Sequence, residues 1–284
     1  MKYVIYDIET LRNCITFCFL DYETRKKKSF VFYNDITPVE ELLKFLRGLY
    51  KHDYYLVGFN NLYFDAQIIE HFIDIAKDKS LTIEEIISSL YNKAQFLIKL
   101  TDEEKWRSTV HESRLTLKNI DLYKQKHYDR PQKATSLKWL EFTMRRRVIK
   151  EMPISHDTLV TEEQIPIILD YNWEDVDATC EFLEKIMFET TLRFSLSDKF
   201  NLKLLNAPEP RIAREIFGKF LSEEMKIKYS ELKEMRTIRD FSTVASLSSI
   251  ITESDSSPVP TKEGRVLGIK TSSGDIDEGM IEEM

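Results

Sequence analysis

The sequence predicts an α/β fold in which a mixed β-sheet is flanked by helices. Short apolar runs rich in β-branched and aromatic residues come first, at residues 3–7, 14–20 and 29–33. Stretches with helical spacing then alternate with two further apolar runs, at 54–59 and 115–122. Strands interleaved with helices in this way form a sheet covered by helical layers. Apolar residues make up 42% of the 284-residue chain, enough to fill the core of one large domain or two small ones.

The five apolar runs are expected to pair in two ways. Short polar connections join the first three, which is typical of an antiparallel meander. The run at 54–59 is almost continuously apolar, like a parallel strand that is buried on both faces. The run at 115–122 alternates and predicts a strand that ends near Asp121. We therefore expect a three-strand antiparallel meander extended by parallel strands.

The helices are predicted from apolar residues spaced three and four apart. These stretches are 38–50, 64–75, 81–100, 135–144, 165–188 and 210–225, with a further turn at 101–106. Thr37 is a candidate N-cap for the first helix. Pro210 lies in the first turn of the last helix, where proline is tolerated.

Charge and composition exclude several functional classes. The chain has 41 basic and 48 acidic residues, a net charge of −7, which argues against a basic protein that coats nucleic acid. Its three cysteines are too few for a disulfide framework or a zinc site, and they fit a reducing cytoplasm. No apolar run reaches the roughly 18 residues of a membrane span, and the N-terminus lacks a signal-peptide pattern. We expect a cytoplasmic protein without a membrane partner.

The composition changes near the end of the chain. From Thr243 onward, eight acidic and three basic residues give a net charge of −5, and Ser, Thr, Gly and Pro are frequent. The apolar periodicity fades in the same stretch. Residues 243–284 are therefore predicted to be a disordered acidic tail or a linker.

Acidic residues recur where predicted elements begin or end. Asp7 and Glu9 lie at the end of the first strand, and alternate residues of a strand face the same way. Asp65 closes the segment Asn-Leu-Tyr-Phe-Asp, which begins at Asn61 and opens the helix after the fourth strand. Each motif also has a plain structural interpretation. The first could be a solvated strand end, and the second could be a helix-capping cluster around Asn60 or Asn61.

A third acidic motif lies within the helix predicted at 165–188. Tyr171 and Asp175 are four residues apart and therefore share one helical face with apolar residues. An acid on such a face needs a partner. A bound cation would provide one, and a salt bridge or a hydrogen bond from Tyr171 is the structural alternative. If the three motifs meet, they form a high-charge site that favours a cation.

Together, the three motifs resemble those of the DEDD exonucleases, a family with the ribonuclease-H-like fold. The family pattern is Asp-x-Glu, then Asn-x-x-(Phe/Tyr)-Asp, then Tyr-x-x-x-Asp, and all three occur in this order within residues 1–190. The second segment is similar to that of proofreading domains of phage DNA polymerases, although Asn60 stands where many relatives have His. Another subclass has His five residues before the last acid. Asp170 stands there, so the resemblance is to the tyrosine subclass.

The resemblance implies a role for each matching residue. The implied ligands of two Mg²⁺ or Mn²⁺ ions are the four acids Asp7, Glu9, Asp65 and Asp175. Tyr171 would orient the attacking water. The implied contacts with the 3′ end of a single strand are Thr10, Leu11, Asn61, Phe64 and Lys138. Two such ions about 4 Å apart would activate the water and stabilise the leaving oxygen.

Aromatic and basic side chains are the predicted means of holding the strand. A base stacked on an aromatic ring gains roughly 1–3 kcal/mol with little sequence preference. The aromatic candidates are Phe59, Tyr63, Phe64 and Trp173. The basic runs 145–147 and 124–133 could meet phosphates or could be solvated faces.

The predicted function is a metal-dependent 3′→5′ exonuclease that releases nucleoside monophosphates from single-stranded DNA, as in proofreading. Residues 1–200 would form the exonuclease domain, with 82–113 as a candidate helical insertion, and 201–242 would form a helical extension. A DNA polymerase domain or other replication proteins are the expected partners, in the host cytoplasm if the chain is phage-encoded. Two alternatives stay open: an RNA-trimming nuclease of the same family, and a non-catalytic module that binds single strands or a polymerase.

Overall fold

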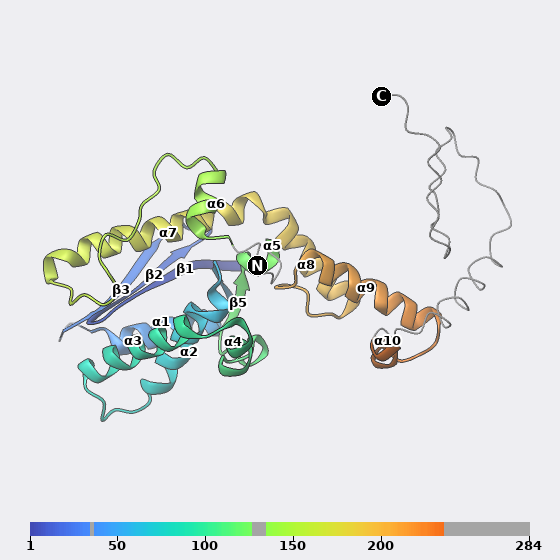
Figure 1. Cartoon of the computed structure of the whole chain (residues 1–284), viewed down its shortest axis with the longest axis horizontal. Coiled ribbons are helices and arrows are strands. Elements are labelled where there is room, and N and C mark those ends of the chain that lie inside the picture. The colour runs from blue at the N-terminus through green and yellow to red at the C-terminus, as the bar shows by residue number, and fades with distance from the viewer. Residues whose placement is uncertain (35–36, 127–134, 236–284) are drawn as a thin grey trace, which may run out of the picture. The chain divides into compact units, whose positions relative to one another are not determined.

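The computed structural model describes residues 1–34, 37–126 and 135–235, and its central feature is a five-stranded sheet (Figure 1). The strands are β1 (Lys2–Leu11), β2 (Cys14–Asp21), β3 (Lys27–Tyr33), β4 (Tyr54–Gly58) and β5 (Lys118–Asp121). Their order is β3-β2-β1-β4-β5. The β1–β2 and β2–β3 pairs are antiparallel, and the β1–β4 and β4–β5 pairs are parallel. The predicted α/β class, with a meander extended by parallel strands, is confirmed.

Ten α-helices connect or follow the strands in the described part of the chain. They are α1 (Val39–Lys51), α2 (Asp65–Ile75), α3 (Ile83–Lys99), α4 (Asp102–Ser108), α5 (Leu122–Lys126), α6 (Leu137–Thr143), α7 (Ile165–Lys185), α8 (Met187–Phe200), α9 (Glu209–Glu224) and α10 (Tyr229–Met235). Short 3₁₀ turns are η1 (Asn61–Tyr63), η2 (Glu112–Arg114) and η4 (Glu162–Gln164). None of the helices in these described segments has both the length and the apolar character that a membrane span needs.

Helical layers cover the two faces of the sheet (Figure 1). Val4, Tyr6 and Ile8 of β1 pack in a core with buried residues of α1, α2 and α3. Tyr3 and Ile5 point the other way and pack in a second core with residues of α7. Because side chains alternate along a strand, the odd-numbered positions that follow also lie on the α7 face. This alternation fixes the side of the sheet on which the acids of β1 lie.

Three element predictions were wrong in detail. Thr37 does not cap α1, which follows Pro38 without a side-chain cap; the Thr37 hydroxyl donates to the Asn34 carbonyl instead. The strand predicted at 115–122 begins only at Lys118. The N–H and hydroxyl of Thr116 donate to the Glu70 carboxylate, so this residue does not pair with β4. The helix predicted at 165–188 stops at Lys185, and α8 follows it.

Helix α8 was not predicted, because its apolar residues form no single buried stripe. Phe188 and Leu192 are exposed, whereas Arg193 is 3% exposed. The Arg193 guanidinium donates to the backbone carbonyls of Gln125, Glu189 and Ala207. The buried Arg193 therefore connects α8 to the chain around α5 through hydrogen bonds to backbone carbonyls. Apolar periodicity in the sequence does not reveal a helix that is held by such polar contacts.

By its internal contacts the chain divides into two units, Met1–Lys226 and Ile227–Met284. The described part of the second unit, residues 227–235, contains helix α10. The predicted tail, residues 243–284, lies outside the described residues. In the segment 82–113, α3 begins with a capping box and buries five residues. All five belong to the core that α2 also lines, so α3 is part of the helical layer on that face.

Two glycines give opposite predictions for stability. A Cβ on Gly58, at the end of β4, would lie 2.7 Å from the Cβ of Asn61, whereas a Cβ on Gly48 in α1 would meet no atom within 4 Å. We expect Gly58→Ala to lower the free energy of unfolding by about 1–3 kcal/mol through overpacking. Gly48→Ala should raise it by about 0.5–1 kcal/mol, since alanine is the better helix former. Urea denaturation measures both, and equal effects of the two substitutions would contradict this account.

Candidate metal centre

Three acidic side chains from two elements meet between the sheet and α7. Asp7 and Glu9 occupy the α7-facing side of β1, and Asp175 projects from α7. One carboxylate oxygen from each of them lies within 4.8 Å of the other two. The sequence predicted that Asp7 and Glu9 share a face and that Asp175 joins them, and the structure brings all three together.

The cluster is buried, and one of its oxygens is left without a partner. Glu9 is 9% exposed and Asp175 is 7% exposed. Asp7 Oδ2 is buried and accepts no hydrogen bond from the described residues. Burial raises the pKa of Asp7 well above its usual value, and the charges of Asp65 and Glu9 raise it further. Burial raises the pKa of Glu9 in the same way, with Asp175 as the next cause. Such mutual repulsion is relieved by a bound cation.

Asp65 lies next to this cluster but is not one of its three members. It is the first residue of α2, and its Oδ1 accepts the backbone N–H of Ile8 at 3.1 Å. The side chain therefore sits against β1 between the positions of Asp7 and Glu9. Burial raises the pKa of Asp65 to about 8, although backbone hydrogen bonds, including that from Ile8, oppose the rise. Of the four predicted ligands, three form one cluster, and the fourth is placed beside Asp7.

A buried hydrogen-bond network fixes the turn that delivers Asp65. Asp121, at the end of β5, accepts the backbone N–H groups of Asn60 and Leu62 at 3.0 and 3.2 Å. The Asn61 amide donates to the Tyr6 hydroxyl and to Asn119 Oδ1. Burial raises the pKa of Asp121 to about 6, and these backbone donors limit the rise. The capping interpretation of this segment was wrong in its residues, because neither Asn60 nor Asn61 caps η1 or α2 with its side chain, and Asp121 accepts the N–H groups of this turn instead.

Among the described residues, Lys138 brings positive charge into the centre. Lys138 Nζ donates to Asp175 Oδ1 and, at 3.1 Å, to Glu141 Oε1 on the same helix. Its ammonium also lies 4.6 Å from the centre of the Tyr171 ring. Burial lowers the pKa of Lys138, but the two carboxylates outweigh this and raise it above its usual value. Lys138 therefore stays charged and partly balances the acids.

The sequence prediction missed Glu141. Its side chain is 0% exposed, and Oε2 accepts no hydrogen bond from the described residues. Its position three residues after Lys138 is the only signal that the sequence offers, because residues three apart meet on a helix. Glu141 provides Lys138 with a second anion beside Asp175.

Tyr171 lies one helical turn before Asp175 on α7, as predicted. Burial raises the pKa of its hydroxyl, and the neighbouring charge of Asp175 raises it further. A hydrogen bond with Asp175 contributes in the same direction. The hydroxyl is therefore protonated at neutral pH and can donate, but it cannot act as a base.

The other predicted contact residues lie mainly in the interior. Thr10, Leu11 and Asn61 are buried, and Leu11 packs with Ile168 of α7. Phe64 is half-buried and packs against the core below α2. Their contacts with a nucleic acid strand stay predictions, because in this structure these side chains pack inside the domain. Lys138 alone among the five reaches the acidic cluster.

The aromatic candidates from the sequence are half-buried and already have neighbours. Phe59 packs edge-on against Tyr123, and Lys124 Nζ lies 4.0 Å from the centre of the Tyr63 ring. Lys27 Nζ lies 4.8 Å from the Trp173 ring. These rings therefore contribute to the packing of the domain, and their contact with a nucleic acid strand stays a prediction.

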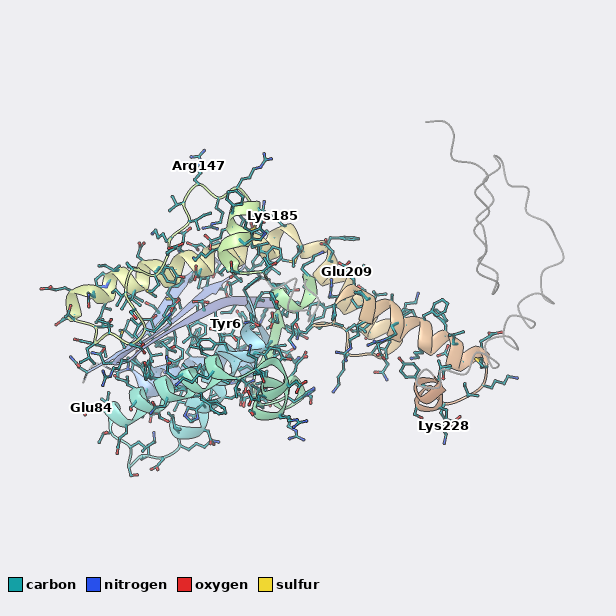
Figure 2. The ribbon with its side chains drawn as sticks, in the orientation of Figure 1. Tyr6, Glu84, Arg147, Lys185, Glu209 and Lys228 are labelled. Carbon is teal, nitrogen blue, oxygen red and sulfur yellow. The ribbon has the colours of Figure 1, made fainter. Side chains whose placement is uncertain are left out.

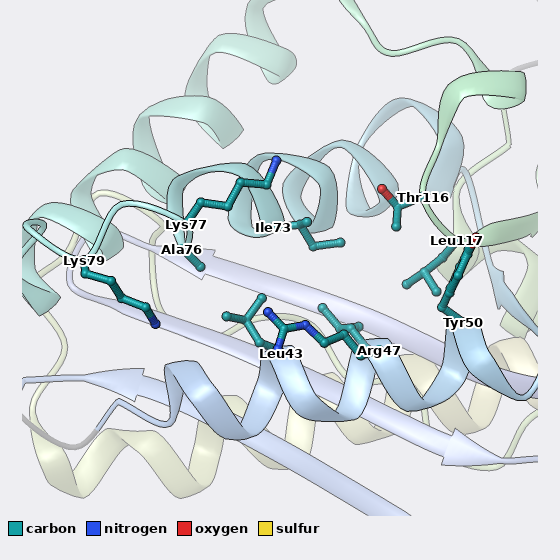
Figure 3. A pocket seen from close by; sticks show the side chains of 10 residues that line it. Leu43, Arg47, Tyr50, Ile73, Ala76, Lys77, Lys79, Thr116 and Leu117 are labelled. Atoms are coloured by element: carbon teal, nitrogen blue, oxygen red, sulfur yellow. The ribbon is translucent and has the colours of Figure 1, made fainter.

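A cavity of about 500 Å³ lies between α1 and α2, on the sheet face opposite α7 (Figure 3). Its floor is apolar, with Leu43, Leu46 and Leu117, and Arg47 and Lys79 lie at its rim. It shares no residue with the acidic cluster. The candidate metal centre is therefore a separate site between β1 and α7.

Comparison of the chain with models of protein families, with curated proteins and with solved structures finds no match. The chemistry of the centre is therefore inferred from its own residues. A buried group of three carboxylates, with a fourth beside it and one lysine, is suited to holding hard divalent cations.

Proposed function

We propose that this chain is a metal-dependent 3′→5′ exonuclease with a ribonuclease-H-like fold that shortens single-stranded DNA. The observation that carries the proposal is the meeting of Asp7, Glu9 and Asp175 within 4.8 Å in a buried site. The order of the three sequence motifs and their similarity to the DEDD exonucleases support it. A DNA polymerase domain or other replication proteins are the partners that this activity would serve.

The donor set fits Mg²⁺ or Mn²⁺, which prefer oxygen ligands and keep several waters. Asp7, Glu9 and Asp175 would hold one ion, and Asp65 together with Asp7 would hold a second. Two features support a cation site: Asp7 Oδ2 accepts no hydrogen bond from the described residues, and the pKa values of Asp7 and Glu9 are raised. When bound, the ions would supply Lewis-acid activation of water and charge stabilisation at the scissile phosphate.

The remaining polar groups of the centre have complementary tasks. The Lys138 ammonium, at the edge of the acidic cluster, would donate to a phosphate oxygen of the terminal nucleotide. Glu141 keeps this ammonium in place from the other side. The protonated Tyr171 hydroxyl would hold the attacking water in line with the phosphate. Asp175 orients that hydroxyl, since the two lie one turn apart on α7.

Substitution of Tyr171 should slow the reaction without removing the metal. We expect Tyr171→Phe to lower the single-turnover rate about 10- to 100-fold, since only the orientation of the water is lost. The rise in unfolding temperature that Mn²⁺ causes should be unchanged, because the hydroxyl is not a ligand. Rapid-quench kinetics and thermal unfolding with and without Mn²⁺ measure the two effects. Loss of the Mn²⁺ effect in this variant would make Tyr171 part of the metal site instead.

The decisive experiment is a time course on a 5′-labelled single strand of DNA, with Mg²⁺ and with a chelator. A ladder that shortens from the 3′ end only in the presence of Mg²⁺ is expected. An RNA strand of the same sequence, run in parallel, separates the DNA enzyme from an RNA-trimming nuclease, because the 2′-hydroxyl distinguishes them. Tight binding without cleavage of either strand would overturn the proposal and favour a non-catalytic module.

A further inference from the structure

Helix α6 carries two large aromatic rings on its outer surface. Trp139 is 58% exposed and Phe142 is 63% exposed. Their ring centres lie 5.5 Å apart, with an angle of 28° between the ring planes, so the two rings stack on each other. Neither ring is buried in the core of the domain. Two exposed aromatic rings side by side form an apolar surface patch, and such a patch is a candidate binding surface.

This aromatic pair is adjacent to the candidate metal centre. Lys138, which precedes Trp139, points inward to Asp175 and Glu141. Residues three apart on a helix share a stripe, so Lys138 and Glu141 form one stripe of α6, and Trp139 and Phe142 form the next. A ligand held at the acidic cluster and extending outward past Lys138 would therefore reach the two rings.

Positive charge flanks the rings on the C-terminal side of α6. The chain turns at Arg145, whose φ is 59°, and Arg146 folds inward to Glu174 and Glu181. Arg145 and Arg147 on either side of it are exposed and form no ion pair with the described residues. Figure 2 shows Arg147 projecting outward from the loop that follows α6. The surface thus combines stacked rings with two exposed guanidinium groups.

We propose that Trp139 and Phe142 form a stacking platform for the bases of a single strand whose 3′ end lies in the metal centre. The inference rests on the proposed nuclease function and names the element that holds the strand outside the cluster. Aromatic faces accept any base, and arginines meet the phosphates, so the platform suits single-stranded nucleic acid without sequence preference. Bases inside a duplex stack on their neighbours and do not offer their faces, so the platform favours single strands over duplex. The charge of Arg145 and Arg147 complements a polyanion.

Binding of a fluorescent 12-nucleotide strand of thymidylate, measured by anisotropy with Ca²⁺ in place of Mg²⁺, tests the platform. We expect Trp139→Ala to weaken binding about tenfold and Trp139→Tyr to retain most of the affinity, because tyrosine also stacks. The matched control is Phe217→Ala on α9, since Phe217 is 67% exposed but does not lie on α6. Its affinity for the strand should equal that of the parent.

The salt dependence of the same binding separates stacking from charge. Trp139→Ala should lower the affinity at every salt concentration and leave the slope of log K against log salt unchanged. A variant with Arg145→Gln and Arg147→Gln should reduce that slope by about 0.7 for each phosphate that the protein no longer neutralises. A reduced slope with Trp139→Ala, or an unchanged one with the arginine variant, would overturn these assignments.

The outcomes distinguish this inference from the proposed function. If the parent shortens strands with Mg²⁺ but Trp139→Ala binds and degrades them as the parent does, the platform is wrong and the nuclease stands. The aromatic surface would then be free for a protein partner. If Trp139→Ala weakens binding but the parent cleaves nothing, the surface binds single strands and the nuclease proposal fails.

Discussion

Asp7→Ala is expected to abolish metal-dependent cleavage, with a loss of roughly 10³-fold or more in single-turnover rate. Asp7 belongs to the cluster of three acids and also lies beside Asp65, so its carboxylate would be a ligand of the proposed metal site. The measurement is the Mg²⁺-dependent time course on a 5′-labelled strand.

The same variant has a readout that does not depend on activity. Without metal, Asp7→Ala removes a carboxyl group whose charged form is disfavoured by burial and by the charges of Asp65 and Glu9, so the unfolding temperature of the variant should equal or exceed that of the parent. The rise in unfolding temperature that Mn²⁺ causes should be reduced or lost, since ligand binding stabilises only the folded state. Cleavage at the parent rate would show that the acidic cluster is not the catalytic site.

Asp170→Ala is the matched control for this experiment. Asp170 is also an acid of the α7 segment, five residues before Asp175, but its side chain is 66% exposed and pairs with Lys150. We expect this variant to retain both the cleavage rate and the Mn²⁺ effect. If Asp170→Ala lost activity to the same extent as Asp7→Ala, the loss in both variants would reflect the removal of an acid in general and not the removal of a metal ligand.

The second large effect is a loss of stability of the metal-free protein as pH rises. Burial raises the pKa of Asp65 to about 8 and that of Asp7 and Glu9 well above their usual values. The folded protein therefore holds these protons at a pH where the unfolded chain has released them. The contribution of such groups to the free energy of unfolding is fully present below their pKa in the unfolded chain, about 4. It is lost as pH rises through their pKa in the folded protein.

Thermal unfolding in a chelator from pH 6 to pH 9 measures this loss. We expect the unfolding temperature to fall by several degrees over this range, because even 1 kcal/mol corresponds to roughly 2–4 °C in a chain of this size. Mn²⁺ should reverse the fall at high pH, since the deprotonated carboxylates are then ligands. Asp65→Asn should flatten the curve in the chelator, and its amide oxygen can still accept the Ile8 N–H. An unfolding temperature that rises with pH in the chelator would contradict the predicted charge state.

The fold was largely predictable because each strand and helix has its own local pattern. Alternation along β1 placed Asp7 and Glu9 on one face, and spacing along α7 placed Tyr171 one turn from Asp175. The failures have equally local causes. The Thr37 hydroxyl bonds the Asn34 carbonyl and therefore does not cap α1. Helix α8 depends on Arg193, whose carbonyl acceptors lie in three different segments of the chain.

The centre itself was predictable only in part. Periodicity indicates which residues share a face of one element, but it does not specify which faces meet or how deeply a side chain is buried. Asn61 belongs to one of the acidic motifs and Leu11 lies at the end of the first strand, and both were predicted to contact a nucleic acid strand. In the structure both side chains are buried in the interior. The buried partner Glu141 matches no motif, because its role comes from the fold of α6 against α7.

The sequence by itself determined the strand pattern, the helix around Tyr171 and which acids are candidates for holding a cation. Tertiary structure alone decided that Asp7, Glu9 and Asp175 form the tight cluster, that Asp65 lies beside it and that Lys138 enters it. The physical reason is that distances of a few ångströms between carboxylates depend on how a strand and two helices pack. That packing minimises the free energy of the whole core and is encoded by no single segment.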